Sequence, residues 1–159
     1  MRRQTRNRAL WGTAFLLLVA AFVGAGFVPH SPDITRQRVE HDMTLDFVNQ
    51  YKLTRSVEGT PVTDVHDTVS CDKGGPKVPD RGPGKDWVCI VHYSASDTPG
   101  GKKILYQLFV HGEACYTATD PTLIENPSIT AKNGSSVTDP LEQFDGCFSV
   151  YDNRTSTTS

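Results

Sequence analysis

The sequence predicts an α+β fold. An N-terminal transmembrane helix is followed by an amphipathic helix packed on a four-stranded antiparallel sheet with a disulfide-tied C-terminal tail. Three observations lead to this prediction: a run of twenty uncharged residues near the N-terminus, apolar residues recurring at helical spacing, and segments of alternating polarity separated by short turn sequences. A single sheet with one apolar face needs a cover, which the amphipathic helix can supply.

The first element is the uncharged run, residues 9–28. A helix of these twenty residues spans roughly 30 Å, the hydrocarbon thickness of a bilayer. Residues 1–8 contain four arginines and no acidic side chain. Because basic residues are retained in the cytoplasm, we expect a short cytoplasmic tail, a single-pass signal-anchor in the cell membrane, and an extracytoplasmic chain from residue 29 onward. The run itself would contact the lipid bilayer.

The same run also fits a cleaved signal peptide, which would leave the mature chain secreted. Small residues suited to a cleavage site occur at Val23-Gly24-Ala25 and at Gly24-Ala25-Gly26. The apolar region of a signal peptide is typically about 7–15 residues long. The greater length of this run favours the anchor.

Residues 29–151 are one domain's worth of chain, and the polar residues 152–159 are expected to form a disordered tail. All eighteen acidic residues but only twelve of the sixteen basic ones follow residue 28, which gives that part a net charge of −6. It carries no basic stripe. We therefore expect no nucleic-acid partner.

The four cysteines all lie on the exported side, where thiols oxidise. They are Cys71, Cys89, Cys115 and Cys147. Two disulfides are the simplest arrangement, for which three connectivities exist. The absence of a Cys-x-x-Cys motif argues against zinc and thioredoxin-type sites. If the first two strands of the sheet pair, Cys71 meets Cys89 across them and Cys115 bonds to Cys147.

The amphipathic helix is predicted to begin with Ser31 as its cap and Pro32 in the first helical position. It would run for about four to five turns and stop before Gly59-Thr60-Pro61. Apolar residues repeat every four positions, which is typical of a helix face that packs on a core. They are Val39, Met43 and Phe47, flanked by Ile34, Val48 and Tyr51.

Strands are predicted by alternation of apolar and polar residues at 65–71, 87–93, 103–111 and 114–119. The third is apolar on both faces, as expected of a central strand. The second is the clearest, and one of its faces is entirely apolar. That face consists of Trp87, Cys89, Val91 and Tyr93.

The connections are inferred from glycine and proline sequences. Residues 97–101 are predicted to form a turn, and Gly112-Glu113 a two-residue type II′ hairpin. The chain after Thr119 is less regular. Residues 139–144 are predicted to form one helical turn, and residues 147–151 a short edge strand.

Residues 72–86 form the longest predicted connection and contain four glycines and three prolines, so no regular element is expected there. Hairpin connections are typically about 2–5 residues, and longer ones often carry function. Four basic side chains make this segment a candidate partner-binding loop. They are Lys73, Lys77, Arg81 and Lys85.

A pattern of cysteines and aromatic residues extends over residues 62–119. It reads Val-x-Cys71, Trp87-x-Cys89-x-Val91-x-Tyr93, Tyr106-x-x-x-Val110 and Cys115-Tyr116. This pattern resembles small exported or membrane-anchored domains of actinobacteria, and the resemblance implies a compartment but no particular activity. The order of one helix and four strands is also similar to cystatin-like folds and to folds like nuclear transport factor 2. The cystatin motif Gln-x-Val-x-Gly is absent, so inhibition of cysteine proteases is not implied.

No catalytic, cofactor-binding or metal-ligating set stands out. The sequence lacks Gly-x-Ser-x-Gly, Ser-x-x-Lys and phosphate-cradling glycine motifs, and no two histidines have the spacing of local metal ligands. We therefore expect a non-enzymatic, protein-binding domain without cofactors, an accessory subunit whose partner is a membrane protein. Two alternatives stay open: a small-ligand-binding domain, and a cell-surface hydrolase whose two carboxylates meet only in space.

Overall fold

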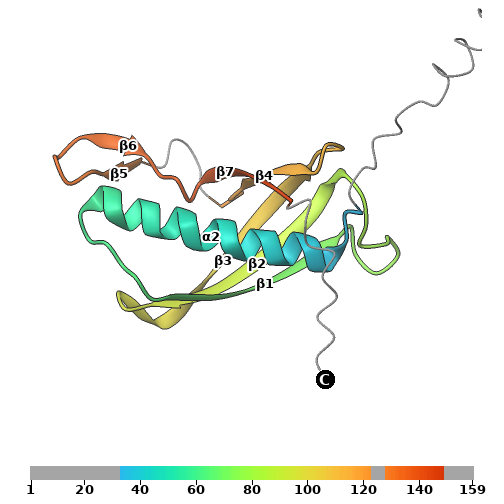
Figure 1. Cartoon of the computed structure of the whole chain (residues 1–159), viewed down its shortest axis with the longest axis horizontal. Helices are drawn as coiled ribbons and strands as arrows, with labels where there is room; N and C mark the ends of the chain where they lie inside the picture. The colour runs from blue at the N-terminus through green and yellow to red at the C-terminus, as the bar shows by residue number, and fades with distance from the viewer. Residues whose placement is uncertain (1–32, 123–127, 149–159) are drawn as a thin grey trace, which may run out of the picture. The chain divides into compact units, whose positions relative to one another are not determined.

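The structure is a computed structural model that describes residues 33–122 and 128–148. In these residues the helix α2 (Arg36–Glu58) lies across one face of a five-stranded antiparallel sheet, and two short strands form a separate hairpin (Figure 1). The sheet order is β1-β2-β3-β4-β7. Its strands are β1 (Val65–Lys73), β2 (Gly84–Ala95), β3 (Thr98–Val110), β4 (Cys115–Thr119) and β7 (Gln143–Cys147), and the hairpin is β5 (Ser128–Thr130) with β6 (Ser136–Thr138).

The main part of the fold prediction is confirmed: one helix packs on an antiparallel sheet whose C-terminal strand carries a disulfide. The predicted membrane span at 9–28, the tails at 1–8 and 152–159, and the predicted cap at Ser31 with Pro32 lie outside the described residues. Among the residues that are described, no helix is both long and apolar enough to cross a bilayer.

Helix α2 packs through the predicted stripe. It is 23 residues long, which is more than the predicted four to five turns. It ends where Gly59 adopts a left-handed conformation at φ +83° and donates its N–H to carbonyl oxygens of the last turn. The fully buried residues of the stripe are Val39, Met43, Phe47 and Tyr51.

The helix begins at Arg36 and residues 33–35 are not helical, so the prediction of helix over these three residues is wrong. Thr35 occupies the cap position with an extended backbone and no side-chain hydrogen bond to the helix. It forms a β-bridge with Arg81, and the carbonyl oxygen of Ile34 accepts a hydrogen bond of 2.8 Å from the N–H of Gly82. This pairing holds residues 34–35 extended, which delays the first helical turn.

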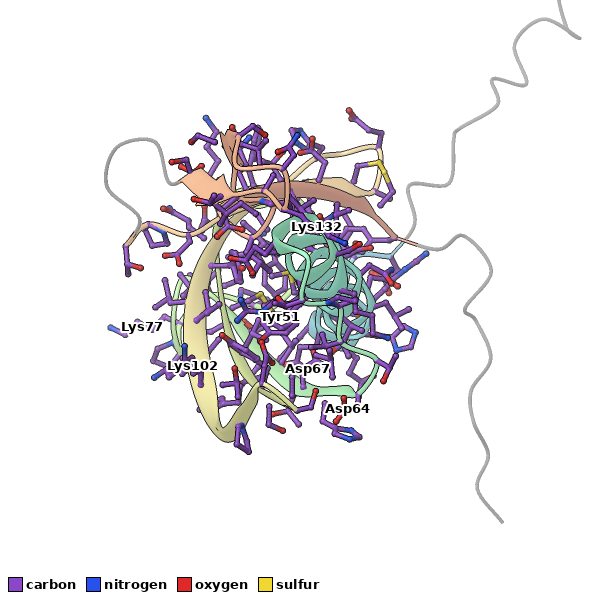
Figure 2. The ribbon with its side chains drawn as sticks, turned by 90° about the vertical axis from the view of Figure 1, so that its left-hand side faces the viewer. Tyr51, Asp64, Asp67, Lys77, Lys102 and Lys132 are labelled. Atoms are coloured by element: carbon purple, nitrogen blue, oxygen red, sulfur yellow. A yellow bond between two sulfur atoms is a disulfide. The ribbon has the colours of Figure 1, made fainter. Side chains whose placement is uncertain are left out.

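The core lies between α2 and the sheet face that it covers, which we call the inner face; the opposite face is the outer face. The predicted apolar face of β2 is confirmed as part of the inner face, since Trp87, Cys89, Val91 and Tyr93 are all buried. Figure 2, which looks along α2 from its C-terminal end, shows Tyr51 between helix and sheet. The rings of Phe47 and Tyr51 each lie with their centroids 5.1 Å from that of Tyr93.

The predicted turn at 97–101 is wrong. Strand β3 already begins at Thr98, so only Ser96 and Asp97 connect it to β2. The register shifts between the pairs of Tyr93 and Ala95, and Gly101 lies in this irregular stretch at φ +68°. Gly100 and Gly101 therefore lie in a bulge within the hairpin and not in its turn.

Two further connections differ from the prediction. The hairpin expected at Gly112-Glu113 is a four-residue connection, 111–114, in which Ala114 adopts a left-handed φ of +68°. Residues 143–147 form β7, a fifth strand paired with β4, where a helical turn and a later edge strand are predicted. Phe144 points to the inner face and is 5% exposed, so burial of this ring outweighs the local helix signal. The β5-β6 hairpin is not among the predicted strands.

Candidate functional site

Both disulfides predicted from strand pairing are present. Cys71 on β1 bonds to Cys89 on β2, and Cys115 on β4 bonds to Cys147 on β7, with Cα atoms 4.1 Å and 3.8 Å apart. The first bridge is buried on the inner face, whereas Cys147 is exposed on the outer face. Each bridge therefore fixes one edge strand to its neighbour, on opposite sides of the sheet.

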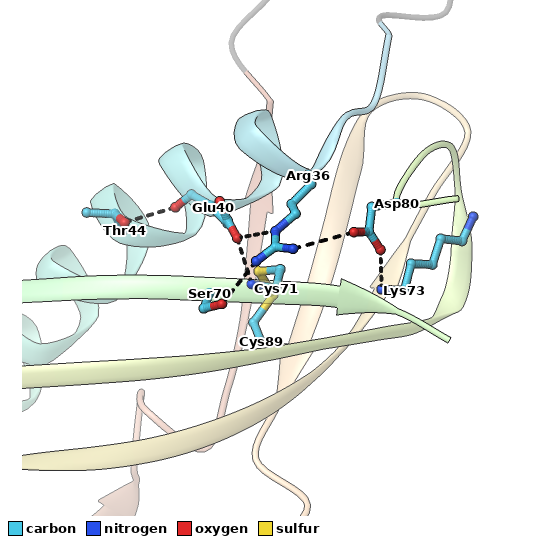
Figure 3. The surroundings of a disulfide bond; sticks show 8 residues. All are labelled: Arg36, Glu40, Thr44, Ser70, Cys71, Lys73, Asp80 and Cys89. Atoms are coloured by element: carbon cyan, nitrogen blue, oxygen red, sulfur yellow. Dashed lines mark hydrogen bonds and ion pairs between the residues drawn. A yellow bond between two sulfur atoms is a disulfide. The ribbon is translucent and has the colours of Figure 1, made fainter. Parts of the chain in front are cut away.

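A network of charged side chains joins the start of α2 to the outer edge of β1 (Figure 3). Glu40 Oε1 accepts hydrogen bonds from Arg36 Nε at 2.8 Å and from the backbone N–H of Cys71 at 2.9 Å. Asp80 Oδ1 accepts one from the backbone N–H of Lys73 at 2.9 Å, and its Oδ2 lies 3.6 Å from Arg36 Nη1. Two N–H groups of the edge strand are thus bonded by carboxylates.

The predicted loop at 72–86 is shorter in the structure, because β1 continues to Lys73 and β2 starts at Gly84. The connection is the 74–83 loop. Lys73 does not present its charge to solvent: it is 8% exposed, and its Nζ donates to the carbonyl oxygens of Arg81, Gly82 and Pro83 at 2.6, 3.3 and 2.8 Å. It holds the loop closed.

The other three basic residues of the candidate loop, Lys77, Arg81 and Lys85, are exposed. Lys85 lies on β2 rather than in the loop, and its Nζ stands 4.9 Å from the ring centroid of Phe109. Among the described residues the side chains of Lys77 and Arg81 have no hydrogen bond or ion pair. Of the four basic residues, Lys73 is therefore internal, and the other three are exposed and accessible to a partner.

The outer face carries an apolar patch that sequence reasoning missed. It lies on the two central strands, where Ile90 of β2 is directly opposite Leu105 of β3. Val88 is 37% exposed and Phe109 is 39% exposed. We call Val88, Ile90, Leu105 and Phe109 the outer patch. A shallow depression of about 410 Å³ lies beside it, lined by Lys85, Gln107, Leu108, Phe109, Thr117 and Thr119.

The signal for this patch was present in the sequence. The third predicted strand is apolar on both faces, which is expected of a strand covered on both sides. In the structure β3 is central in the sheet but covered on one side only, within the part of the chain that is described. An apolar outer position on such a strand is therefore a surface feature.

The space between helix and sheet is filled rather than open. Tyr106 and Tyr116 are fully buried, and burial raises the pKa of both hydroxyls. Tyr116 Oη donates to Asp46 Oδ2 at 2.6 Å, and Tyr106 Oη donates to the carbonyl oxygen of Leu141 at 2.8 Å. Burial also raises the pKa of Asp46, partly offset by the bond from Tyr116. These tyrosines are packed structural groups with satisfied hydroxyls.

Asp67 is the one carboxylate that β1 places on the inner face, and it differs from the satisfied tyrosines in its hydrogen bonding. Its Oδ2 is buried and has no hydrogen-bond partner in the described structure. Burial raises the pKa of Asp67 to about 6. It lines an open depression of about 580 Å³ with His66, His92 and Ser94 among others, but no second carboxylate lines this depression, so we assign Asp67 no catalytic role.

The histidines do not assemble a site in the described residues. His66 and His92 are exposed on neighbouring strands, and the residue opposite His92 on β3 is Lys103. His111 stacks against Phe109 with ring centroids 4.1 Å apart. Within the described chain no group of three or more His, Cys, Asp or Glu side chains could hold a metal ion.

Comparison with known proteins found no matching family model, no similar curated protein and no similar solved structure.

Proposed function

We propose that this protein is a membrane-anchored, extracytoplasmic and non-enzymatic domain that binds a membrane protein as an accessory subunit, with the outer patch as its binding surface. The observation that carries the proposal is the asymmetry of the sheet. One face is covered by α2, while the other presents Val88 and Ile90 on β2 beside Leu105 and Phe109 on β3, with Gln107 between the last two. Protein interfaces place such apolar and aromatic groups at their centre and polar groups at their rim.

The rim of the outer patch is polar in this way. Thr117 and Thr119 on β4 and Lys85 on β2 flank it, whereas Gln107 lies within it, opposite Val88 and between Leu105 and Phe109 on β3. Scattered apolar residues are ordinary on protein surfaces, but adjacent ones on two paired strands form a continuous area. The filled space between α2 and the sheet supports protein binding over the alternative of a small ligand held there.

A partner in the membrane follows from the short connection. Residue 28 ends the apolar run and Asp33 starts the described domain, so five peptide units of at most about 3.6 Å join them. In an anchored chain Asp33 would therefore lie within about 18 Å of the end of the span. A domain tethered by so short a connection would meet proteins of the same membrane at a raised effective concentration.

The test uses the full chain, extracted with its membrane in mild detergent after photo-crosslinking. Val88→Lys combined with Phe109→Glu places charges in the outer patch. Leu45→Lys combined with Leu53→Glu is the matched control, because these leucines are 52% and 50% exposed on α2. We expect the patch variant to lose a crosslinked complex that the parent and the control retain. A chain that stays monomeric in all three forms, or a complex that is lost only in the control, overturns the proposal.

A further inference from the structure

The end of the domain that carries the start of α2 also carries the 74–83 loop (Figure 1). The two segments are hydrogen-bonded to each other. Besides the Ile34 to Gly82 bond, the N–H of Arg36 donates to the carbonyl oxygen of Asp80 at 3.1 Å. The loop is therefore attached to the first residues that follow the predicted membrane span.

We propose that the 74–83 loop rests on the bilayer surface and binds the headgroups of anionic phospholipids through Lys77 and Arg81, with Val78 between them at the membrane. This inference rests on the proposed anchor. It differs from the outer patch in both location and chemistry, because the loop's partner is lipid and the patch's partner is protein.

The loop is held rigid without using these two cations. Lys73 Nζ binds three of its carbonyl oxygens, and Trp87 Nε1 donates to the carbonyl oxygen of Gly82 at 3.1 Å. The N–H of Gly75 donates to Asp72 Oδ1 at 2.6 Å, and the N–H of Val78 to the carbonyl oxygen of Gly75 at 3.0 Å. Binding would therefore need little ordering of the backbone, which lowers its entropic cost.

The acidic residue inside the loop already has partners within the domain. Asp80 accepts the N–H of Lys73 and lies against Arg36, as described above. Two other carboxylates, Asp72 and Asp86, lie on the flanking strands at the base of the loop. Lys77 and Val78 lie in the turn of residues 75–78, where Val78 is 40% exposed, and Arg81 is exposed where the loop bridges to Thr35. A basic tip with an exposed apolar side chain suits an anionic interface.

Chain length brings this tip within reach of the membrane. Ile34, which is bonded to Gly82, is six peptide units from residue 28, or at most about 22 Å. Two basic residues bind anionic lipid weakly, since each raises the binding constant by only about five-fold. An anchor compensates, because it converts the contact into an intramolecular one at millimolar effective concentration.

The test places the full chain in lipid nanodiscs that contain either phosphatidylcholine alone or about one third phosphatidylglycerol. All four cysteines of the sequence are disulfide-bonded, so Val78→Cys offers one site for an environment-sensitive fluorophore. Ser96→Cys, in the connection at the other end of β2, is the matched site. Quenching by a headgroup nitroxide reports contact with the bilayer.

We expect at least a two-fold stronger quenching at position 78 than at position 96 in anionic discs, lost in high salt and in the double variant Lys77→Glu with Arg81→Glu. Lys102→Glu with Lys103→Glu, which alters exposed lysines of β3, should leave it unchanged. Equal quenching at positions 78 and 96, or quenching unaffected by the loop variant, overturns the lipid contact while the anchor stands. A parent chain that does not enter the discs overturns the anchor and the contact together.

Discussion

Glu40 and Cys71 are joined by a hydrogen bond of 2.9 Å from the backbone N–H of Cys71 to the carboxylate of Glu40. The bond ties α2 to the edge strand β1 beside the buried disulfide (Figure 3). The same carboxylate oxygen holds Arg36 at 2.8 Å. One side chain thus connects the first turn of the helix with the last residues of the first strand.

Replacing Glu40 should therefore destabilise the domain. We expect Glu40→Ala to lower the free energy of unfolding by about 1–3 kcal/mol, because it leaves the N–H of Cys71 and the guanidinium of Arg36 without this acceptor. Glu40→Gln keeps an acceptor and should cost less. Urea unfolding measures both, with the exposed Gln37→Ala as control. An alanine variant as stable as that control contradicts the assignment.

The buried carboxylate of Asp67 predicts a pH dependence. Its pKa is about 6 in the folded chain against an ordinary value of 3.8, because burial penalises the charged form. The folded state then binds this proton more tightly than the unfolded state. The free energy of unfolding consequently falls as the pH rises from about 4 to about 6. Above pH 6 the full cost of burying the charged carboxylate remains.

Asp67→Asn should remove that cost. We expect it to stabilise the domain by about 1 kcal/mol at pH 7.5, since solvent screening at a partly exposed strand reduces the effect, and to be neutral near pH 4. The difference in unfolding free energy between variant and parent, measured across this range, isolates the group from other carboxylates. Asp64→Asn, at an exposed position nearby, is the control. A difference that does not vary with pH refutes the prediction.

Gly146 on β7 should tolerate no side chain. A Cβ at this position would overlap Asp46 Oδ2 and the phenol ring of Tyr116. We expect Gly146→Ala to destabilise by about 1–3 kcal/mol, because the buried pair must shift. Gly112→Ala places its methyl group in open space and is the control. Thermal unfolding compares the two, and equal midpoints would show that the pair adapts freely.

The bridge between Cys115 and Cys147 closes 32 residues, and that between Cys71 and Cys89 closes 18. Removing the Cys115–Cys147 bridge by Cys115→Ala with Cys147→Ala should lower the free energy of unfolding by about 3–4 kcal/mol. Strand β7 pairs with β4 alone, so we expect amide exchange to accelerate most in β7. The corresponding loss of Cys71 and Cys89 should leave β7 protected. Equal acceleration in both variants would show that the bridges act on the whole fold.

The same substitution should have different effects at Lys73 and at Lys77. Lys73→Met removes a donor that holds three carbonyl oxygens, so the 74–83 loop should open and become sensitive to limited proteolysis. Lys77→Met changes an exposed side chain and should leave cleavage at the parent rate. Faster cleavage in the Lys77 variant, or none in the Lys73 variant, would reverse the roles assigned to the two lysines.

Features that depend on short-range periodicity were predictable from the sequence. The four-residue repeat of Val39, Met43 and Phe47 specifies a helix face, and the alternation from Trp87 to Tyr93 specifies a buried strand face. Pairing of the first two strands was then sufficient to bring Cys71 to Cys89. These signals are carried by neighbouring residues and need no knowledge of the tertiary structure.

Features that depend on distant residues were not predictable. The late start of α2 is caused by pairing of Thr35 with Arg81, and β7 forms because Phe144 packs on the inner face. Lys73 is one of four similar basic residues in the sequence, and only the folded loop distinguishes it from the others. The apolar outer positions of β3 are visible in the sequence, but they do not reveal that this face is not the one that α2 covers.

The two carboxylates at the edge of β1 have a further consequence. An edge strand exposes N–H groups that can pair with a second copy of the same sheet. If the proposed anchor confines the protein to a membrane surface, its copies would meet in two dimensions and at high local density. Glu40 and Asp80 occupy the N–H groups of Cys71 and Lys73, so this part of the edge is closed to intermolecular β-pairing. The side chains that join helix and loop to the sheet thus also cover part of its open edge.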